Sequence, residues 1–80
     1  MTKEELRKRL IAENIPRQEY SLDGGLPNEA CCLVQNGSQW EVYYSERGKK
    51  TGLKIFDSEE AACDHFYTWL TDSLKRMGMI

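Results

Sequence analysis

Apolar residues at helical spacing predict a helix near the start of the chain. Thr2 and Glu5 have the spacing of a capping box, in which each side chain bonds a backbone N–H that the first turn leaves free. The apolar positions that follow at helical spacing are Leu6, Leu10 and Ile11. Asn14 and Pro16 end this helix, because the residue before a proline is pushed out of the helical conformation.

A second, longer helix is predicted from about residue 58 to Arg76. Asp57 and Ser58 offer side-chain oxygens to its N-terminus, and acidic residues in its first turn suit the helix dipole. Its core-facing stripe consists of Ala62, Phe66, Trp69, Leu70, Ser73, Leu74 and Met77. His65 falls on the polar side of this helix, so we expect a surface histidine.

Alternating apolar and polar residues between the helices predict strands. Segments 30–35 and 39–45 flank Asn36-Gly37, a strong hairpin signal, because a type I′ turn needs positive φ at both central positions. One face of the second strand consists of Trp40, Val42 and Tyr44. The opposite face is expected to be partly wet and consists of Glu41, Tyr43 and Ser45. A third strand is predicted at 51–56, with Leu53 and Ile55 on one face.

Residues 20–28 are rich in turn formers and are expected to form an ordered loop or a short edge strand. The predicted order is therefore helix, three strands, helix. We predict an α+β fold in which a three-stranded antiparallel β-meander packs with an N-terminal and a longer C-terminal helix (α-β-β-β-α), both on one face of the sheet. The 80 residues provide material for one domain, residues 1–80.

Composition indicates a folded, soluble binding module. The chain is 40% hydrophobic and 30% charged, which suits a small core and does not suit a membrane span. Catalysis needs a nucleophile beside a base, two carboxylates in different environments or a metal cluster, and the residue pattern supplies none of these. We therefore expect no enzyme activity, no cofactor and no bound metal.

The three cysteines, Cys31, Cys32 and Cys63, match neither a disulfide framework nor a zinc site. Their number is odd, and Cys31 and Cys32 are neighbours whose side chains point to opposite faces of a strand. We expect packed thiols in a reducing compartment, with a redox or metal role as the alternative. The first residues are charged and lack the apolar run of a signal peptide, so a cytoplasmic location is expected.

Charge is segregated along the chain, although the net charge is only −2. Residues 19–46 carry five carboxylates and no lysine or arginine, together with several aromatic residues. Carboxylates beside exposed aromatic side chains are typical of protein-binding surfaces. The predicted partner contacts are Asp23, Glu29, Glu41, Tyr43 and Glu46. A plain solvated surface is the alternative interpretation.

Residues 47–56 form the opposite, basic segment. Its charges are Arg47, Lys49, Lys50 and Lys54. They support a second hypothesis, a small nucleic-acid-binding or regulatory module, because four cations can contact phosphates. The element order is that of double-stranded RNA-binding domains, which place lysines at the start of the second helix. This chain has Asp57, Glu59 and Glu60 there, so electrostatics argue against nucleic acid.

The central part of the chain carries a distinctive string of residues. YSLDGGLPNEACCL is followed by WEVYYSERGKKTGLKIFDSEEAAC and by the aromatic-rich HFYTWL, together about residues 20–70. This block resembles small bacterial immunity proteins encoded beside polymorphic or contact-dependent growth inhibition toxins. The resemblance implies a cytosolic protein without catalytic activity that binds and blocks the cognate C-terminal toxin domain. Such proteins often place acidic groups against a basic toxin site, which suits the acidic segment 19–46.

Overall fold

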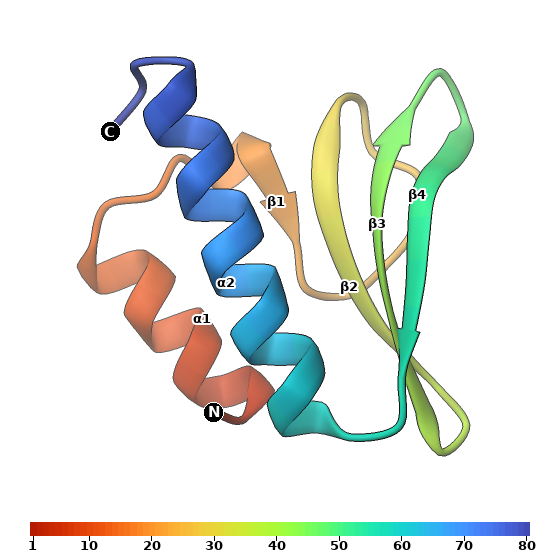
Figure 1. The fold of residues 1–80 in the computed structure, drawn as a ribbon. Coiled ribbons are helices and arrows are strands. Elements are labelled where there is room, and N and C mark those ends of the chain that lie inside the picture. The colour runs from red at the N-terminus through yellow and green to blue at the C-terminus, as the bar shows by residue number, and fades with distance from the viewer.

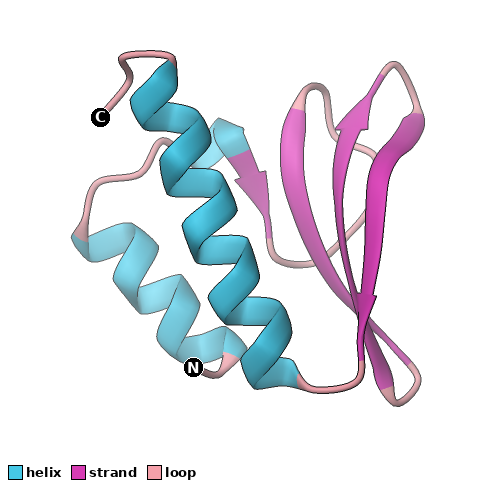
Figure 2. Cartoon of the chain, in the orientation of Figure 1, coloured by secondary structure: helices cyan, strands magenta, loops and turns pink.

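The computed structural model describes residues 1–80 as two helices on one side of a four-stranded sheet (Figure 1). The strands follow one another in the order β1-β2-β3-β4. Helix α2 packs against the sheet, and α1 packs alongside α2 (Figure 2). This arrangement confirms the predicted α+β class and the placement of both helices on one face. Neither helix has a stretch that is long and apolar enough to cross a membrane.

The two helices begin where local side-chain chemistry predicts. Helix α1 spans Lys3–Ala12, and helix α2 spans Glu59–Arg76. At α1 the Thr2 N–H donates to Glu5 Oε1 at 2.7 Å, and the Glu5 N–H donates to Thr2 Oγ1 at 3.2 Å. At α2 the Ser58 hydroxyl accepts a backbone N–H of the first turn at 3.1 Å. These bonds satisfy N–H groups that no helical carbonyl can reach.

The sheet contains one strand more than predicted. Three strands form the expected antiparallel meander, namely β2 (Ala30–Asn36), β3 (Gln39–Glu46) and β4 (Lys49–Phe56). The short 3₁₀ helix η1 (Arg17–Glu19) leads into β1 (Tyr20–Ser21), which pairs parallel with β2. The sheet is therefore mixed, and the prediction of three antiparallel strands is incomplete. The start of the turn-rich stretch 20–28 thus takes the second of its two expected forms, a short edge strand, and the following residues form a loop. Its parallel pairing was not predicted, because no local hairpin turn joins parallel strands.

Both hairpin turns are tight, and each depends on positive φ angles. Between β2 and β3 the turn residues are 37 and 38, and Gly37 has a φ of 64°. The turn therefore lies one residue later than predicted, with Asn36 already paired to Gln39. Between β3 and β4, Arg47 and Gly48 have φ angles of 51° and 73°, as a type I′ turn requires. This short turn lets β4 begin two residues earlier than expected.

The apolar core lies between the helices and the sheet. Its buried members are Leu6, Leu10, Ile15, Leu22, Cys31, Leu33, Trp40, Val42, Ala62, Cys63, Phe66, Leu70 and Leu74. The predicted stripe of α2 is thus confirmed at most positions. Two residues predicted to face the core do not: Ile11 is 59% exposed and Met77 is 60% exposed. Each lies at the end of its helix, where no other element covers it.

The far side of the sheet is closed by residues 22–29, which connect β1 to β2 and pass across it (Figure 1). The Tyr43 hydroxyl donates to the Gly25 carbonyl at 2.6 Å, and the Ser45 hydroxyl donates to the Pro27 carbonyl at 2.7 Å. Gly24 has a φ of 72°, and a Cβ atom there would lie only 2.9 Å from the Val34 side chain. The expectation that this face of β3 is partly wet is therefore wrong at Tyr43 and Ser45, which are 1% and 0% exposed.

Candidate protein-binding site

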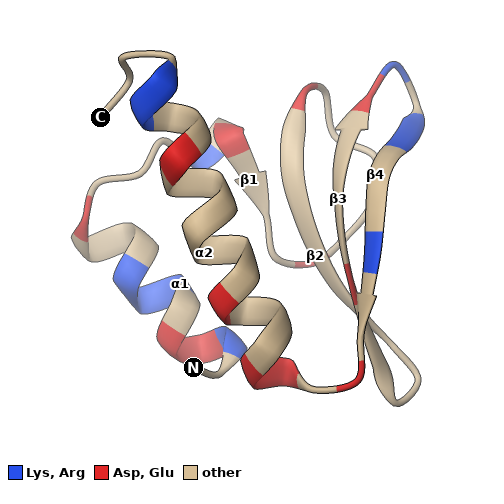
Figure 3. Cartoon of the chain, in the orientation of Figure 1, with Lys and Arg blue, Asp and Glu red and all other residues tan.

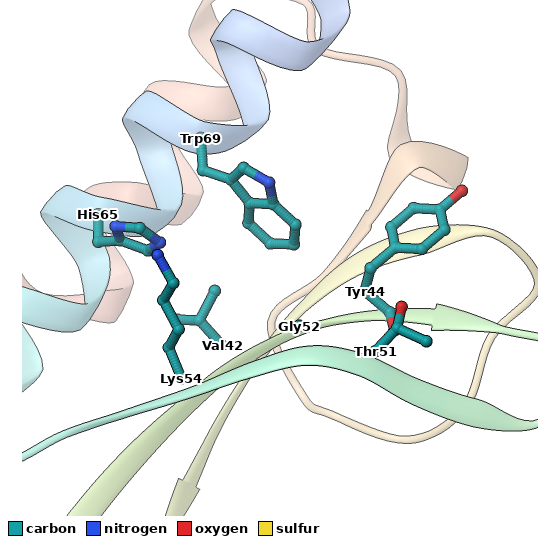
Figure 4. A pocket seen from close by; sticks show the side chains of 7 residues that line it. All are labelled: Val42, Tyr44, Thr51, Gly52, Lys54, His65 and Trp69. Atoms are coloured by element: carbon teal, nitrogen blue, oxygen red, sulfur yellow. The ribbon is translucent and has the colours of Figure 1, made fainter.

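A groove lies between α2 and the sheet. The short segment 57–58 joins β4 to α2, and the two elements diverge from it (Figure 1). The space between them is a hollow of about 270 Å³, lined by Val42, Tyr44, Thr51, Gly52, Lys54, His65 and Trp69 (Figure 4). A second hollow of about 380 Å³ lies against the C-terminal half of α2 and shares Tyr44 and Trp69 with the first. We call the two hollows together the α2 groove.

Two aromatic side chains form the centre of the α2 groove. Trp69 comes from α2 and Tyr44 from β3, and Figure 4 shows them on opposite sides of the first hollow. Both side chains are half-buried, while Phe66 beneath Trp69 is fully buried and meets it edge-on at 6.2 Å between ring centroids. The core therefore holds one side of Trp69 in place and leaves another side open to a ligand or partner.

One end of the groove is basic. His65 lies between Phe56 and Trp69, with ring centroids 5.2 Å and 6.4 Å away, so it faces the groove and is not the surface histidine expected on the polar side of α2. The Lys54 ammonium points toward the His65 ring (Figure 4). Burial lowers the pKa of His65, and the positive charge of Lys54 lowers it further. An anionic group that binds here is met by the positive charge of Lys54.

The other end of the groove is acidic. Figure 3 shows acidic positions at one end of the sheet, where η1 ends, β2 begins and β3 ends. Glu19 and Glu29 line the second hollow. Burial raises the pKa of the Tyr44 hydroxyl, and the negative charges of Glu29, Glu46 and Glu19 raise it further. The three carboxylates therefore act together on the aromatic centre of the groove.

Three of the five predicted partner contacts are not available at the groove. Tyr43 is buried under residues 22–29 and cannot contact a partner. Glu41 lies on the same closed face and accepts hydrogen bonds from Asn36 at 3.0 Å and Lys50 at 3.4 Å, which hold the pKa of its carboxyl below the ordinary range. Asp23 pairs with the Lys3 ammonium at 2.9 Å on the other side of the molecule.

Of the remaining two predicted contacts, Glu29 lines the second hollow. Glu46 lines a separate hollow with Arg47, Lys49 and Thr51, and its charge contributes to the raised pKa of Tyr44. The structure thus brings together two of the five residues and adds Glu19 from η1. Glu19 comes from η1, Glu29 from the turn before β2 and Glu46 from the end of β3, so the pairing of β2 with both β1 and β3 brings them to one end of the sheet.

The basic segment 47–56 does not form one continuous cationic surface. Lys50 lies on the closed face, where its ammonium is 4.7 Å from the centre of the Tyr43 ring and pairs with Glu41. Lys54 lies on the opposite face, at the α2 groove (Figure 4). Because phosphate binding benefits from cations that share one face, this division gives the nucleic-acid hypothesis no support.

The cysteines are buried and their thiols are not activated. Burial raises the pKa of Cys31 to about 12 and that of Cys63 to about 11. Cys32 is buried as well, and all three thiols are free. A thiol must ionise to act as a nucleophile or metal ligand, which these surroundings oppose. No group of three or more histidine, cysteine or carboxylate side chains is placed to hold a metal ion.

Trp69, Tyr44 and His65 are the groove residues that sequence patterns assign to other roles. Trp69 and Tyr44 carry a core-facing signal, and they do face the core side, but α2 and the sheet diverge before covering them. The available signal is the spacing of His65 and Trp69, which at i and i+4 share one stripe of the helix. That stripe lies beside the buried stripe of α2, so its side chains are at the boundary between the core and the solvent.

Comparison with protein-family models finds no match for this chain, and no solved structure matches it.

Proposed function

We propose that this chain is a protein-binding domain of the immunity type, which binds a toxin domain and blocks it without catalysis of its own. The observation that carries the proposal is the α2 groove, in which half-buried aromatic side chains adjoin a cluster of carboxylates. Partly exposed tryptophan and tyrosine over a fixed core are the side chains most often responsible for protein-protein affinity. The resemblance of residues 20–70 to immunity proteins names the class of partner.

The acidic end of the groove supplies specificity in this proposal. Glu19, Glu29 and Glu46 present negative charge beside Tyr44, and a basic surface on the toxin complements it. Complementary charge accelerates encounter and disfavours partners of the wrong sign. The contact residues are thus Trp69, Tyr44 and these carboxylates, in place of Tyr43 and Glu41.

The test is coexpression of the chain with the toxin domain encoded by the gene beside it. Growth should be restored in cells that make both proteins, and calorimetry on the purified pair should show a one-to-one complex. Glu29→Lys should weaken binding about ten-fold or more, because an interfacial carboxylate is replaced by a like charge of the partner. The matched control is Glu4→Lys on α1, far from the groove, which should bind normally.

A second variant tests the aromatic centre. Trp69→Ala should weaken binding more than Thr68→Ala, which changes the neighbouring exposed residue of the same helix. Circular dichroism confirms that both variants fold. If no toxin domain binds the chain, or if neither Glu29→Lys nor Trp69→Ala weakens the complex, the proposal is wrong.

A further inference from the structure

Strand β4 is a free edge of the sheet. It pairs with β3 on one side, has no strand on the other, and is exposed from Lys49 to Ile55. The outer edge of such a strand presents N–H and C=O groups that another extended chain can bond. Natural sheets protect long edges with charge and irregularity, and β4 carries lysines and a register shift opposite Tyr43. The lysines of β4 repel a cationic segment and attract an anionic one, so they favour an acidic partner strand.

The α2 groove runs directly beside this edge. Its first hollow takes Thr51, Gly52 and Lys54 from β4, and His65 and Trp69 from the facing side of α2 (Figure 4). A strand added to the outer edge of β4 directs every second side chain toward α2, over this hollow. Nothing lies within 4 Å of the position that a Cβ atom of Gly52 would occupy, so the strand is open at this point. Backbone pairing and side-chain insertion are therefore compatible in one binding mode.

The chemistry of the hollow defines the side chains it accepts. Val42, Tyr44 and Trp69 provide apolar surface, and Lys54 provides the positive charge. The added strand should therefore direct two side chains toward α2, an apolar one and a carboxylate. They are two residues apart, because alternate residues of a strand share a face. On the other face of the added strand, Leu53 and Ile55 of β4 are 47% and 55% exposed and match apolar residues.

A second copy of this chain is a poor occupant. Antiparallel pairing of β4 with another β4 brings Lys49 and Lys54, which the pairing with Glu46 and Val42 places on one face, close to those of the other copy. Like charges across paired strands are destabilising, whereas carboxylates opposite lysines are favourable. Charge complementarity therefore points to a different protein with an acidic extended segment.

We propose that the partner adds an extended strand to the outer edge of β4, with an apolar side chain and a carboxylate, two residues apart, inserted between β4 and α2. The identity of the partner as a toxin domain rests on the proposed function, while the strand addition rests on β4 and the groove. The toxin segment then carries a carboxylate for Lys54 and, further along the interface, a basic surface for Glu29.

A synthetic peptide tests the strand addition without the toxin. The probe is an acetylated and amidated peptide of sequence Thr-Ile-Phe-Val-Glu-Val-Thr, and its control has lysine in place of the glutamate. Hydrogen exchange of the full chain in millimolar peptide should slow at amides of β4, and NMR shifts should appear at Trp69 and His65. The glutamate peptide should bind about ten-fold more tightly than the lysine peptide. Lys54→Glu should reverse that order, and Lys8→Glu on α1 should leave it unchanged.

The same measurements on the complex with the toxin domain separate the two proposals. Slower exchange at β4, together with weaker binding by Lys54→Glu, supports strand addition by the toxin itself. A toxin complex in which β4 exchanges as in the free chain overturns the strand addition and leaves the proposed function standing. If the peptide binds at β4 but the chain forms no complex with the toxin domain, the strand addition stands and the proposed function is overturned. No peptide-induced change at β4, or equal affinity for the two peptides, also overturns the strand addition.

Discussion

Tyr43 and Tyr44 are neighbours on β3 and point to opposite faces of the sheet. Residues 22–29 cover the face of Tyr43, whereas the face of Tyr44 is only partly covered by α2. Tyr43 is 1% exposed, and its hydroxyl donates to the Gly25 carbonyl at 2.6 Å. Burial raises its pKa to about 12. Tyr44 is half-buried in the α2 groove, and no hydrogen bond joins its hydroxyl to the rest of the chain. Adjacent residues of the same type thus have different surroundings because they point to opposite faces.

The difference follows from the elements that cover each face. Residues 22–29 lie close against the far side of the sheet, as the short approach of Gly24 to Val34 shows. Helix α2 is joined to β4 at one end only and diverges from it, so its side of the sheet stays open along the groove (Figure 1). The closed face contributes stability, and the open face is available for binding. Four pairs of variants test this division, beginning with the largest expected effect.

Removing each tyrosine side chain should affect stability very differently. Tyr43→Ala should lower the free energy of unfolding by about 3–5 kcal/mol, because it leaves a cavity under residues 22–29. Tyr44→Ala should lower it by about 1–2 kcal/mol, because part of that side chain is already in water. Denaturant unfolding measures both values. Equal losses would contradict the contrast between a closed and an open face.

The glycines of the covering segment provide a matched pair. Gly24→Ala should lower the free energy of unfolding by about 2–3 kcal/mol, since a left-handed φ and overlap with Val34 both oppose the new methyl group. Gly25→Ala has the same unfavourable sign of φ but nothing within 4 Å, so it should lose only about 1 kcal/mol. Thermal unfolding compares the two. A larger loss for Gly25→Ala would show that close packing on Val34 is not what seals this face.

Removing only the hydroxyl groups sharpens the comparison. Tyr43→Phe should cost about 1 kcal/mol of stability, because the Gly25 carbonyl loses its donor. Tyr44→Phe should change stability by less than about 0.5 kcal/mol, because its hydroxyl makes no bond within the chain. Chemical denaturation of both variants is the measurement. A substantial loss in Tyr44→Phe would mean that the open face also contributes a structural hydrogen bond.

The smallest expected effects are changes in the free energy of unfolding with pH. The open and the closed face should show them in different pH ranges. The pKa of His65 in the groove is lowered from 6.5, so below 6.5 the unfolded chain binds more protons than the folded one. Stability therefore falls as pH drops from 6.5 toward the folded pKa of His65, and His65→Gln should abolish this slope.

Glu41, on the closed face, should show its effect at lower pH. Its pKa is lowered from 4.5 by Asn36 and Lys50, so its contribution is present above 4.5 and is lost as pH falls through the folded value. Glu41→Gln should reduce the slope in that range and leave the remainder, because the pKa values of Glu5, Glu13 and Asp23 are lowered as well. Unfolding curves across both ranges test the assignment, which fails if His65→Gln leaves the slope near neutral pH unchanged.

Local pattern was sufficient for the helices and the antiparallel strands. The capping box of Thr2 and the Ser58 cap need only residues three positions away, and the β2–β3 hairpin needs only a short turn containing Gly37. The core stripe of α2 likewise depends on its own periodicity. These features are readable because the interacting groups are close together in the sequence.

The candidate site could be predicted only in part. Glu29 and Glu46 were predicted from the acidic charge of segment 19–46, and both act on Tyr44 at the groove. Glu41 and Tyr43 were predicted from the same segment but lie on the face that residues 22–29 cover. Alternation along β3 shows which residues share a face, but it does not show which face a distant segment will cover. The structure therefore places Tyr43 and Glu41 on the closed face, while the partner contacts themselves stay a prediction.

The sequence by itself determined the α+β class, the ends of the helices, the hairpins and the segregation of charge, because each follows from spacing or composition along the chain. Only the tertiary structure decided that β1 pairs parallel with β2, that residues 22–29 close one face, and that α2 leaves a groove beside β4. These outcomes depend on contacts between residues far apart in the chain, whose geometry no local pattern encodes. The groove that unites Trp69, Tyr44 and Lys54 belongs to this second group.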